Sequence, residues 1–203
     1  MRLIKDIEQD RNSRVLVYIT GDRPGLETRI AFDVFPFVFE HLTKMGEMEK
    51  LDLFLYSPGG LTIAGYGLAN LLLEFCDSYS TIVPFKALST ATLITLGAKE
   101  ILMTKFGQLG PVDPSIEHAL GPTVQLNPPQ ETRVPINVED AISYLELARG
   151  EGRLKDEASL SQVFDRLSNT VHPLALGAVN RVREQIRFLA KNLLKNHFEY
   201  NDC

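Results

Sequence analysis

The stretch Leu51-Asp-Leu-Phe-Leu-Tyr-Ser-Pro-Gly-Gly60 decides how this chain folds. Residues 52–56 alternate and are rich in Leu, Phe and Tyr, which predicts a strand, and the Ser-Pro-Gly-Gly run then ends it. Apolar residues return at helical spacing from Leu61 to Phe75, which predicts a helix. Because glycine has no Cβ, the diglycine can take a positive φ and bring its N–H groups close to a ligand at the start of that helix. Taken alone, the pattern fits a plain strand-to-helix turn equally well.

A second segment of the same kind follows about thirty residues later, Ala87-Leu-Ser-Thr-Ala-Thr-Leu-Ile-Thr-Leu-Gly-Ala98. A short strand is predicted before it, and Ser89 stands at the start of a small apolar run that predicts a helix. A serine in this place is commonly an N-cap, whose hydroxyl accepts a bond from a nearby backbone amide. The alternative is that Ser89, the Thr90 amide and the Gly60 amide meet at one point. A hydroxyl with two amide donors is what an acyl-transfer site needs.

Several motifs in this chain resemble those of one known group of proteins. They are the Ser-Pro-Gly-Gly turn, the serine that opens an apolar helix, the strand and turn of residues 100–114, and two further stretches, Val17-Tyr-Ile-Thr-Gly-Asp-Arg-Pro-Gly-Leu-Glu-Thr28 and Val171-His-Pro-Leu-Ala-Leu-Gly177. Taken in their order along the chain, these five stretches resemble the ClpP/crotonase superfamily, and most closely its SppA-like branch, the serine dehydrogenase proteinase (SDH) family. The resemblance covers the chain from about residue 15 to about residue 194.

This resemblance implies an α/β fold of repeated ββα units that form two sheets, with a helical C-terminal segment. It also implies that Ser89 is the nucleophile and that the Gly60 and Thr90 amides form the oxyanion hole. One such donor contributes about 3 kcal/mol to transition-state stabilisation. Members of this group continue for several tens of residues beyond the position that corresponds to Cys203.

A general base for Ser89 is harder to find, because the hydroxyl is a poor nucleophile until a positioned group accepts its proton. ClpP-type enzymes place a histidine about 25 residues after the serine, where this chain has Pro111-Val-Asp-Pro114. SppA-type enzymes use a lysine 40 to 50 residues after the serine, and residues 130–142 contain no lysine. Neither pattern is met.

The remaining candidates for the base are histidines and lysines. His172 precedes the helix that starts at Pro173 and is the tentative base, although a structural role at the helix start is the simpler interpretation. His118 lies in a proline-rich loop and is the alternative base. Lys86 and Lys105 qualify only if burial lowers their pKa enough to leave them neutral. Asp113 either orients the base or caps its own tight turn.

Composition limits the function further. The chain has 203 residues, 44% of them hydrophobic, and a formal net charge of −5. The negative charge and the lack of a basic patch argue against a nucleic acid or an anionic membrane as partner. The first ten residues have acidic side chains where a signal peptide needs an apolar core, and no apolar run approaches the roughly 18 residues that span a bilayer. We therefore expect a cytoplasmic protein.

The two cysteines, Cys76 and Cys203, have no metal-site spacing, so we expect neither metal nor cofactor.

We predict a single domain over residues 1–203, with residues 137–203 mainly helical. The proline-rich segment 110–135 is predicted as a long irregular loop that covers the site or binds substrate. Asn137 is predicted as the N-cap of the helix that follows it. The last helix, residues 173–196, carries a broad apolar stripe that packs either on the sheet or on neighbouring subunits. The resemblance favours the second arrangement, and we expect a homo-oligomer.

Three hypotheses for the function remain at this point. The first is a serine peptidase or related hydrolase that forms an acyl-enzyme on Ser89 and acts on a peptide or protein. The second is a non-catalytic oligomeric scaffold or peptide-binding module with the same fold but without a competent base. The third is a crotonase-type acyl-CoA enzyme, which would use the same two amides without needing the serine.

Overall fold

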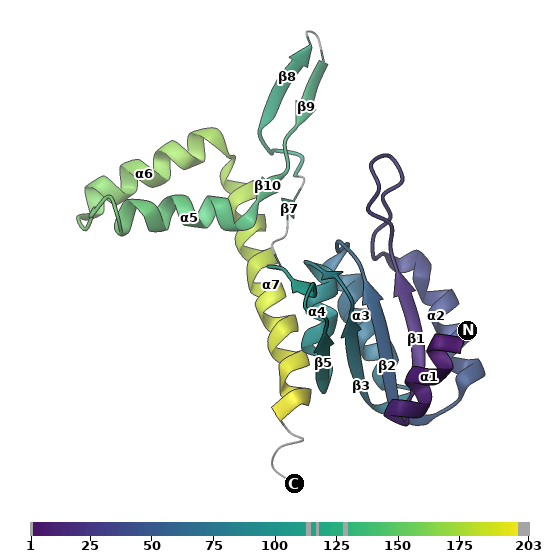
Figure 1. Cartoon of the computed structure of the whole chain (residues 1–203). Coiled ribbons are helices and arrows are strands. Elements are labelled where there is room, and N and C mark those ends of the chain that lie inside the picture. Colours follow the sequence, from purple (N-terminus) through teal and green to yellow (C-terminus); the bar gives the residue numbers. More distant parts are fainter. Residues whose placement is uncertain (1, 113–114, 117, 128–129, 199–203) are drawn as a thin grey trace. The chain divides into compact units, whose positions relative to one another are not determined.

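A computed structural model describes residues 2–112, 115–116, 118–127 and 130–198 (Figure 1). Contacts divide the chain into two compact units. The first contains residues 1–112 and 188–203, and the second contains residues 113–187. Each unit has a hydrophobic cluster of its own. The single domain over residues 1–203 stays a prediction.

The first unit is built on a four-stranded parallel sheet in the order β1-β2-β3-β5. Its strands are β1 (Arg14–Ile19), β2 (Met48–Tyr56), β3 (Cys76–Val83) and β5 (Glu100–Met103). The chain passes through α2 (Phe35–Met45), α3 (Thr62–Leu73) and α4 (Thr90–Leu96) between successive strands. The α/β class is confirmed.

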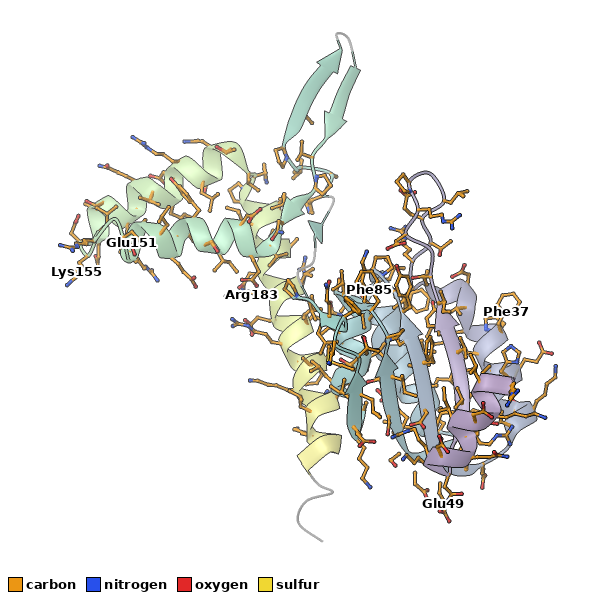
Figure 2. The ribbon with its side chains drawn as sticks, in the orientation of Figure 1. Phe37, Glu49, Phe85, Glu151, Lys155 and Arg183 are labelled. Atoms are coloured by element: carbon orange, nitrogen blue, oxygen red, sulfur yellow. The ribbon has the colours of Figure 1, made fainter. Side chains whose placement is uncertain are left out.

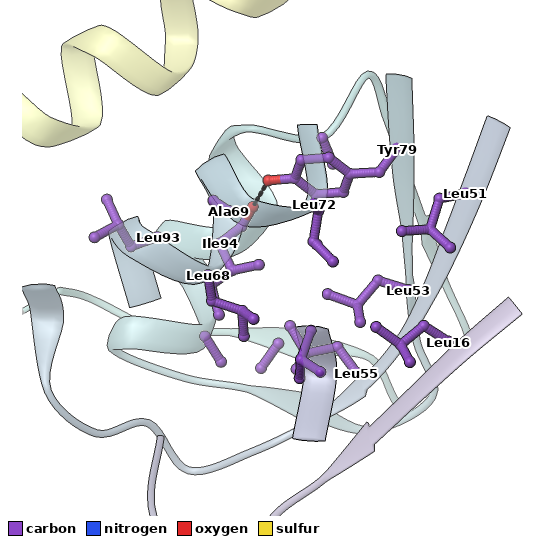
Figure 3. Close-up of a cluster of buried hydrophobic side chains, with 14 of the residues drawn as sticks. Leu16, Leu51, Leu53, Leu55, Leu68, Ala69, Leu72, Tyr79, Leu93 and Ile94 are labelled. Atoms are coloured by element: carbon purple, nitrogen blue, oxygen red, sulfur yellow. Dashed lines mark hydrogen bonds between the residues drawn. The ribbon is translucent and has the colours of Figure 1, made fainter. Parts of the chain in front are cut away.

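The core of the first unit lies between β2 and the helices (Figure 3). Leu51, Leu53 and Leu55 occupy alternate positions of β2 and are fully buried, as strand periodicity requires. Each contributes about 1.5–3 kcal/mol by leaving water. The buried Tyr79 hydroxyl donates a 2.6 Å hydrogen bond to the Ile94 carbonyl, which ties α4 to β3.

The N-terminal helix α1 (Arg2–Arg11) is attached to the sheet through a buried carboxylate. Asp52 in β2 is fully buried and accepts hydrogen bonds from Arg11 Nε at 2.6 Å and from Ser13 Oγ at 2.6 Å. Arg11 also pairs with Glu100 at 2.6 Å. Without Arg11 the charge of Asp52 would be buried and unpaired, which is strongly destabilising. The Arg11–Asp52 pair therefore holds the end of α1 against the sheet.

A short second sheet continues from the first at the carboxyl ends of its strands. It pairs β4 (Lys86–Ala87) with β6 (Gln108–Leu109) in parallel, and Ala87 also bridges to Ser57 beyond the end of β2. Figure 2 shows Phe85 at this end of the unit and Glu49 at the opposite end. Ligands of open parallel sheets bind outside the carboxyl ends of the strands, so the candidate site is expected here.

The second unit contains short strands and helices. Its strands are β7 (Ser115–Ile116), β8 (Thr123–Asn127), β9 (Gln130–Arg133) and β10 (Ile136–Asn137), and its helices are α5 (Val138–Arg149), α6 (Glu157–Thr170) and most of α7 (Pro173–Phe198). The Asn137 side chain accepts from the amides of Glu139 and Asp140, which confirms the predicted N-cap.

The prediction of an irregular loop over residues 110–135 is wrong for much of the segment. Its second half contains β8 and β9, which pair as an antiparallel hairpin, and β7 in its first half pairs with β10, which follows the segment. The paired segments themselves contain no proline, which would break a ladder. The many prolines around them hid the strands.

Helix α7 contributes apolar side chains to both hydrophobic clusters. Ala175 and Val179 belong to the core of the second unit, and Leu193 belongs to the core of the first. Phe188 is 62% exposed. None of the helices formed by the described residues combines the length and apolar character that crossing a membrane requires.

Candidate active site

Ser89 lies in a strained turn between β4 and α4. Its backbone has φ 53° and ψ −120°, and the Ala91 amide donates to the Leu88 carbonyl at 3.0 Å. An i to i+3 bond with these angles at the first central residue is the geometry of a type II′ turn, where glycine is preferred. A non-glycine residue held at such angles costs about 1–3 kcal/mol.

The side chain of Ser89 does not cap α4, because it makes no hydrogen bond to the helix amides. The N-cap interpretation is therefore wrong for this chain. Ser89 is half-buried and stands in a sharp turn between strand and helix. Nucleophilic serines of α/β-hydrolase enzymes occupy strained turns of this kind, because the turn exposes the hydroxyl.

The diglycine turn lies directly against Ser89. Gly59 has φ 119°, and a Cβ built on it would lie 2.8 Å from Ser89 Cβ and 3.2 Å from Ser89 Oγ. A Cβ on Gly60 would lie 2.1 Å from the Ile30 carbonyl oxygen. Both positions therefore need glycine, the first for its φ and its contact with Ser89, the second for its contact with the Ile30 backbone.

Hydrogen bonds around Gly60 orient its amide. The Gly59 carbonyl accepts from the Ile30 amide at 2.9 Å. In a trans peptide the carbonyl and the next N–H point in opposite directions, so the Gly60 N–H points away from Ile30. The Gly60 carbonyl accepts from Thr90 Oγ1 at 2.7 Å. The start of α4 thus lies on the side of Gly60 that faces away from Ile30.

The Thr90 amide belongs to the first residue of α4. The first amides of a helix have no carbonyl partner within the helix. The two segments are also joined before the turn, because the Ser57 amide donates to the Lys86 carbonyl at 2.9 Å and the Leu88 amide donates to the Ser57 carbonyl at 3.0 Å. The structure therefore brings Gly59, Gly60, Ser89 and Thr90 together.

The two histidine candidates for the base belong to the second unit, whereas Ser89 belongs to the first. His172 Nδ1 accepts from the Leu174 amide at 3.2 Å, and His118 Nδ1 accepts from the Leu120 amide at 3.1 Å. A neutral imidazole that accepts through Nδ1 carries its proton on Nε2. Either histidine must therefore release this bond before it can accept a proton. Asp113 lies outside the described residues.

Lys86 is held in an ion pair beside the site. Its Nζ lies 2.8 Å from Asp22 Oδ2, and this bond raises the pKa of Lys86 above its usual value. A lysine held in its charged form cannot accept the serine proton, so the geometry disfavours Lys86 as the base. Lys105 is exposed in the turn after β5.

Asp22 is at the centre of a cluster of contacts that the sequence did not predict. The Tyr56 hydroxyl donates to Asp22 at 2.7 Å, and the Lys86 Nζ lies 5.1 Å above the Phe85 ring. The bonds from Lys86 and then Tyr56 lower the pKa of Asp22. These contacts fix the loop after β1 to the carboxyl edge of the sheet. The partners are far apart in the chain, so only the fold brings them together.

No group of three or more His, Cys, Asp or Glu side chains within the described residues is placed to hold a metal ion. Burial raises the pKa of the Cys76 thiol to about 12. That thiol donates to the Leu72 carbonyl, so Cys76 is an unreactive core side chain.

Comparison with known proteins identifies the family. The model of the ClpP-like SDH-type serine proteinases matches residues 1–142, more than half of the chain. The chain belongs to this family. The match contains both glycines and Ser89, and it ends before α6 and α7.

Two similar proteins come from Methanocaldococcus jannaschii. The uncharacterized protein MJ1495 is 32% identical over 124 residues, which are 57% of this chain and 42% of the relative. The uncharacterized protein MJ0137 is 28% identical over 133 residues, which are 61% of this chain and 46% of the relative. The matched part of the chain thus corresponds to less than half the length of each relative.

Proposed function

We propose that this chain is a serine peptidase that cleaves peptides or proteins through an acyl-enzyme on Ser89. The observation that carries the proposal is the strained turn at Ser89, which holds a hydroxyl with no capping partner against the diglycine turn. A structural serine gains nothing from such backbone angles, whereas a nucleophile gains exposure and a fixed position.

In the proposed reaction, Ser89 Oγ attacks the carbonyl carbon of the scissile peptide bond while its proton passes to a base. The oxyanion of the tetrahedral intermediate accepts hydrogen bonds from the Gly60 and Thr90 amides. The amine leaves with the proton from the base, and water then hydrolyses the ester by the same route. Losing one amide donor should cost about 10²–10³-fold in kcat.

The base is proposed to be His172, with His118 as the alternative, in either case after the imidazole releases its bond to the local amide. The local use of Nδ1 in both histidines also supports a second function, that of a peptide-binding scaffold. In that case the site binds a peptide in the same turn and leaves Ser89 unacylated. The proposed assembly is a homo-oligomer in both cases.

Turnover separates the two functions. Unfolded casein and a mixture of peptides are incubated with the wild type and with Ser89→Ala, and the products are identified by mass spectrometry. The peptidase proposal expects cleavage by the wild type and none by Ser89→Ala, with both proteins folded. Equal binding of peptide by both proteins, without cleavage by either, would establish the scaffold.

A further inference from the structure

Two buried hydroxyl groups, those of Thr20 and Ser57, lie next to the diglycine turn. Thr20 follows β1 and is 4% exposed, and Ser57 follows β2 and is 0% exposed. Thr20 Oγ1 donates to Ser57 Oγ at 2.7 Å. The backbone holds the two residues together as well, because the Thr20 amide donates to the Tyr56 carbonyl at 2.9 Å.

Ser57 uses its hydroxyl to shape the turn that follows. Ser57 Oγ accepts from the Gly59 amide at 3.0 Å and lies 3.4 Å from the Gly59 carbonyl oxygen, to which it donates. A serine hydroxyl that forms a hydrogen bond with the backbone two residues further along the chain stabilises a local turn in place of a backbone–backbone hydrogen bond. The Ser57 proton is therefore directed at Gly59, and its lone pairs are used by Gly59 and Thr20.

The peptide between Gly59 and Gly60 is the part of the turn that matters for the proposed chemistry. Its carbonyl is held by the Ile30 amide and by Ser57 Oγ, so the direction of the Gly60 N–H is fixed with it. Two consecutive glycines have more backbone conformational freedom than any other pair of residues. Without these bonds the peptide could rotate and turn the Gly60 N–H away from Ser89.

We propose that the Thr20–Ser57 hydroxyl pair is a positioning device that holds the Gly59–Gly60 peptide in the orientation required by the oxyanion hole. This inference rests on the proposed function of Ser89. Ser57 is not a second nucleophile, because it is fully buried and its hydroxyl is engaged on both sides. Thr20 acts through Ser57 and does not touch the substrate.

The position of Thr20 allows a sharp test. Thr20→Val removes the hydroxyl and keeps the branched shape, whereas Thr20→Ser keeps the hydroxyl. Thr81→Val is the matched control, because Thr81 is a buried threonine of β3 and its hydroxyl has no hydrogen-bond partner within the described residues. Ser57→Ala is the second variant, which removes the acceptor of the Gly59 amide.

The rate at which a fluorophosphonate probe acylates Ser89 is measured for all variants well below their melting temperatures, together with kcat and KM on a cleaved peptide. Thr20→Val and Ser57→Ala should lower the acylation rate and kcat by about tenfold or more with KM unchanged, because the lost interaction acts in the transition state. Thr20→Ser and Thr81→Val should remain near the wild type.

The outcomes separate the inference from the function on which it rests. If Thr20→Val acylates as fast as Thr81→Val, the positioning role is refuted and the peptidase proposal stands. A rise in KM with unchanged kcat also refutes it, because the pair would then act on substrate binding. A folded wild type that does not acylate refutes both.

Discussion

Replacing Ser89 by glycine should make the protein more stable than replacing it by alanine, which reverses the usual order of these two residues. Ser89 has φ 53° and ψ −120°, and its side chain forms no cap. Alanine keeps the Cβ that conflicts with these angles, whereas glycine removes it. Both variants lose the hydroxyl, so their difference isolates the backbone strain at the site.

The magnitude follows from two opposing effects. Holding a non-glycine residue at these angles costs about 1–3 kcal/mol. Glycine adds conformational freedom to the unfolded chain, which lowers the free energy of unfolding by about 0.4–1 kcal/mol. The net expectation is that Ser89→Gly exceeds Ser89→Ala by about 1 kcal/mol. For a chain of this size that difference raises Tm by about 2–4 °C.

The assay is thermal unfolding of both variants followed by circular dichroism, with Ser161 as the control. Ser161 lies on the exposed side of α6, where ordinary helical angles favour alanine over glycine by about 1 kcal/mol. Ser161→Gly should therefore melt below Ser161→Ala, in the opposite order to the Ser89 pair. If Ser89→Gly also melts below Ser89→Ala, the strained turn and the argument built on it are refuted.

Three further predictions concern the base, the loop after β1 and the assembly. If His172 is the base, His172→Gln should slow probe labelling of Ser89 by about a hundredfold at neutral pH, whereas His118→Gln should label at the wild-type rate. If both variants label Ser89 at the wild-type rate between about pH 5 and 9, both histidines are excluded as the base. Because Lys86 lowers the pKa of Asp22, their pair adds stability at neutral pH that is lost as the pH falls through the folded-state pKa of Asp22. The melting temperature of the wild type should therefore exceed that of Asp22→Asn at neutral pH, and this excess should shrink as the pH is lowered; an excess that stays constant into acid would contradict the prediction. Sedimentation at micromolar concentration should give a mass well above 22.7 kDa, and a clean monomer would exclude the homo-oligomer.

Several segments could be predicted because their signals are local. Alternating apolar residues predict β2, the helical spacing after Gly60 predicts α3, and Asn137 predicts the start of α5. Each of these depends on residues within one turn or one strand, where side-chain periodicity decides the structure.

Other features could not be predicted because they depend on contacts between distant parts of the chain. The positive φ of Ser89 contradicts its residue type, since a residue chosen for stability alone would be glycine there. The Thr20–Ser57 pair forms only when β1 and β2 align in register, which places Ile19 opposite Tyr56. The hairpin of β8 and β9 was missed because prolines flank it.

Covalent labelling of Ser89 is the most direct test of the central claim. The folded wild type is incubated with a fluorophosphonate probe, digested and analysed by mass spectrometry, with Ser89→Ala treated in parallel. The account predicts a single adduct on Ser89 in the wild type and no adduct in Ser89→Ala. An adduct on another serine, or no adduct on the folded wild type, would show that Ser89 is not an activated nucleophile.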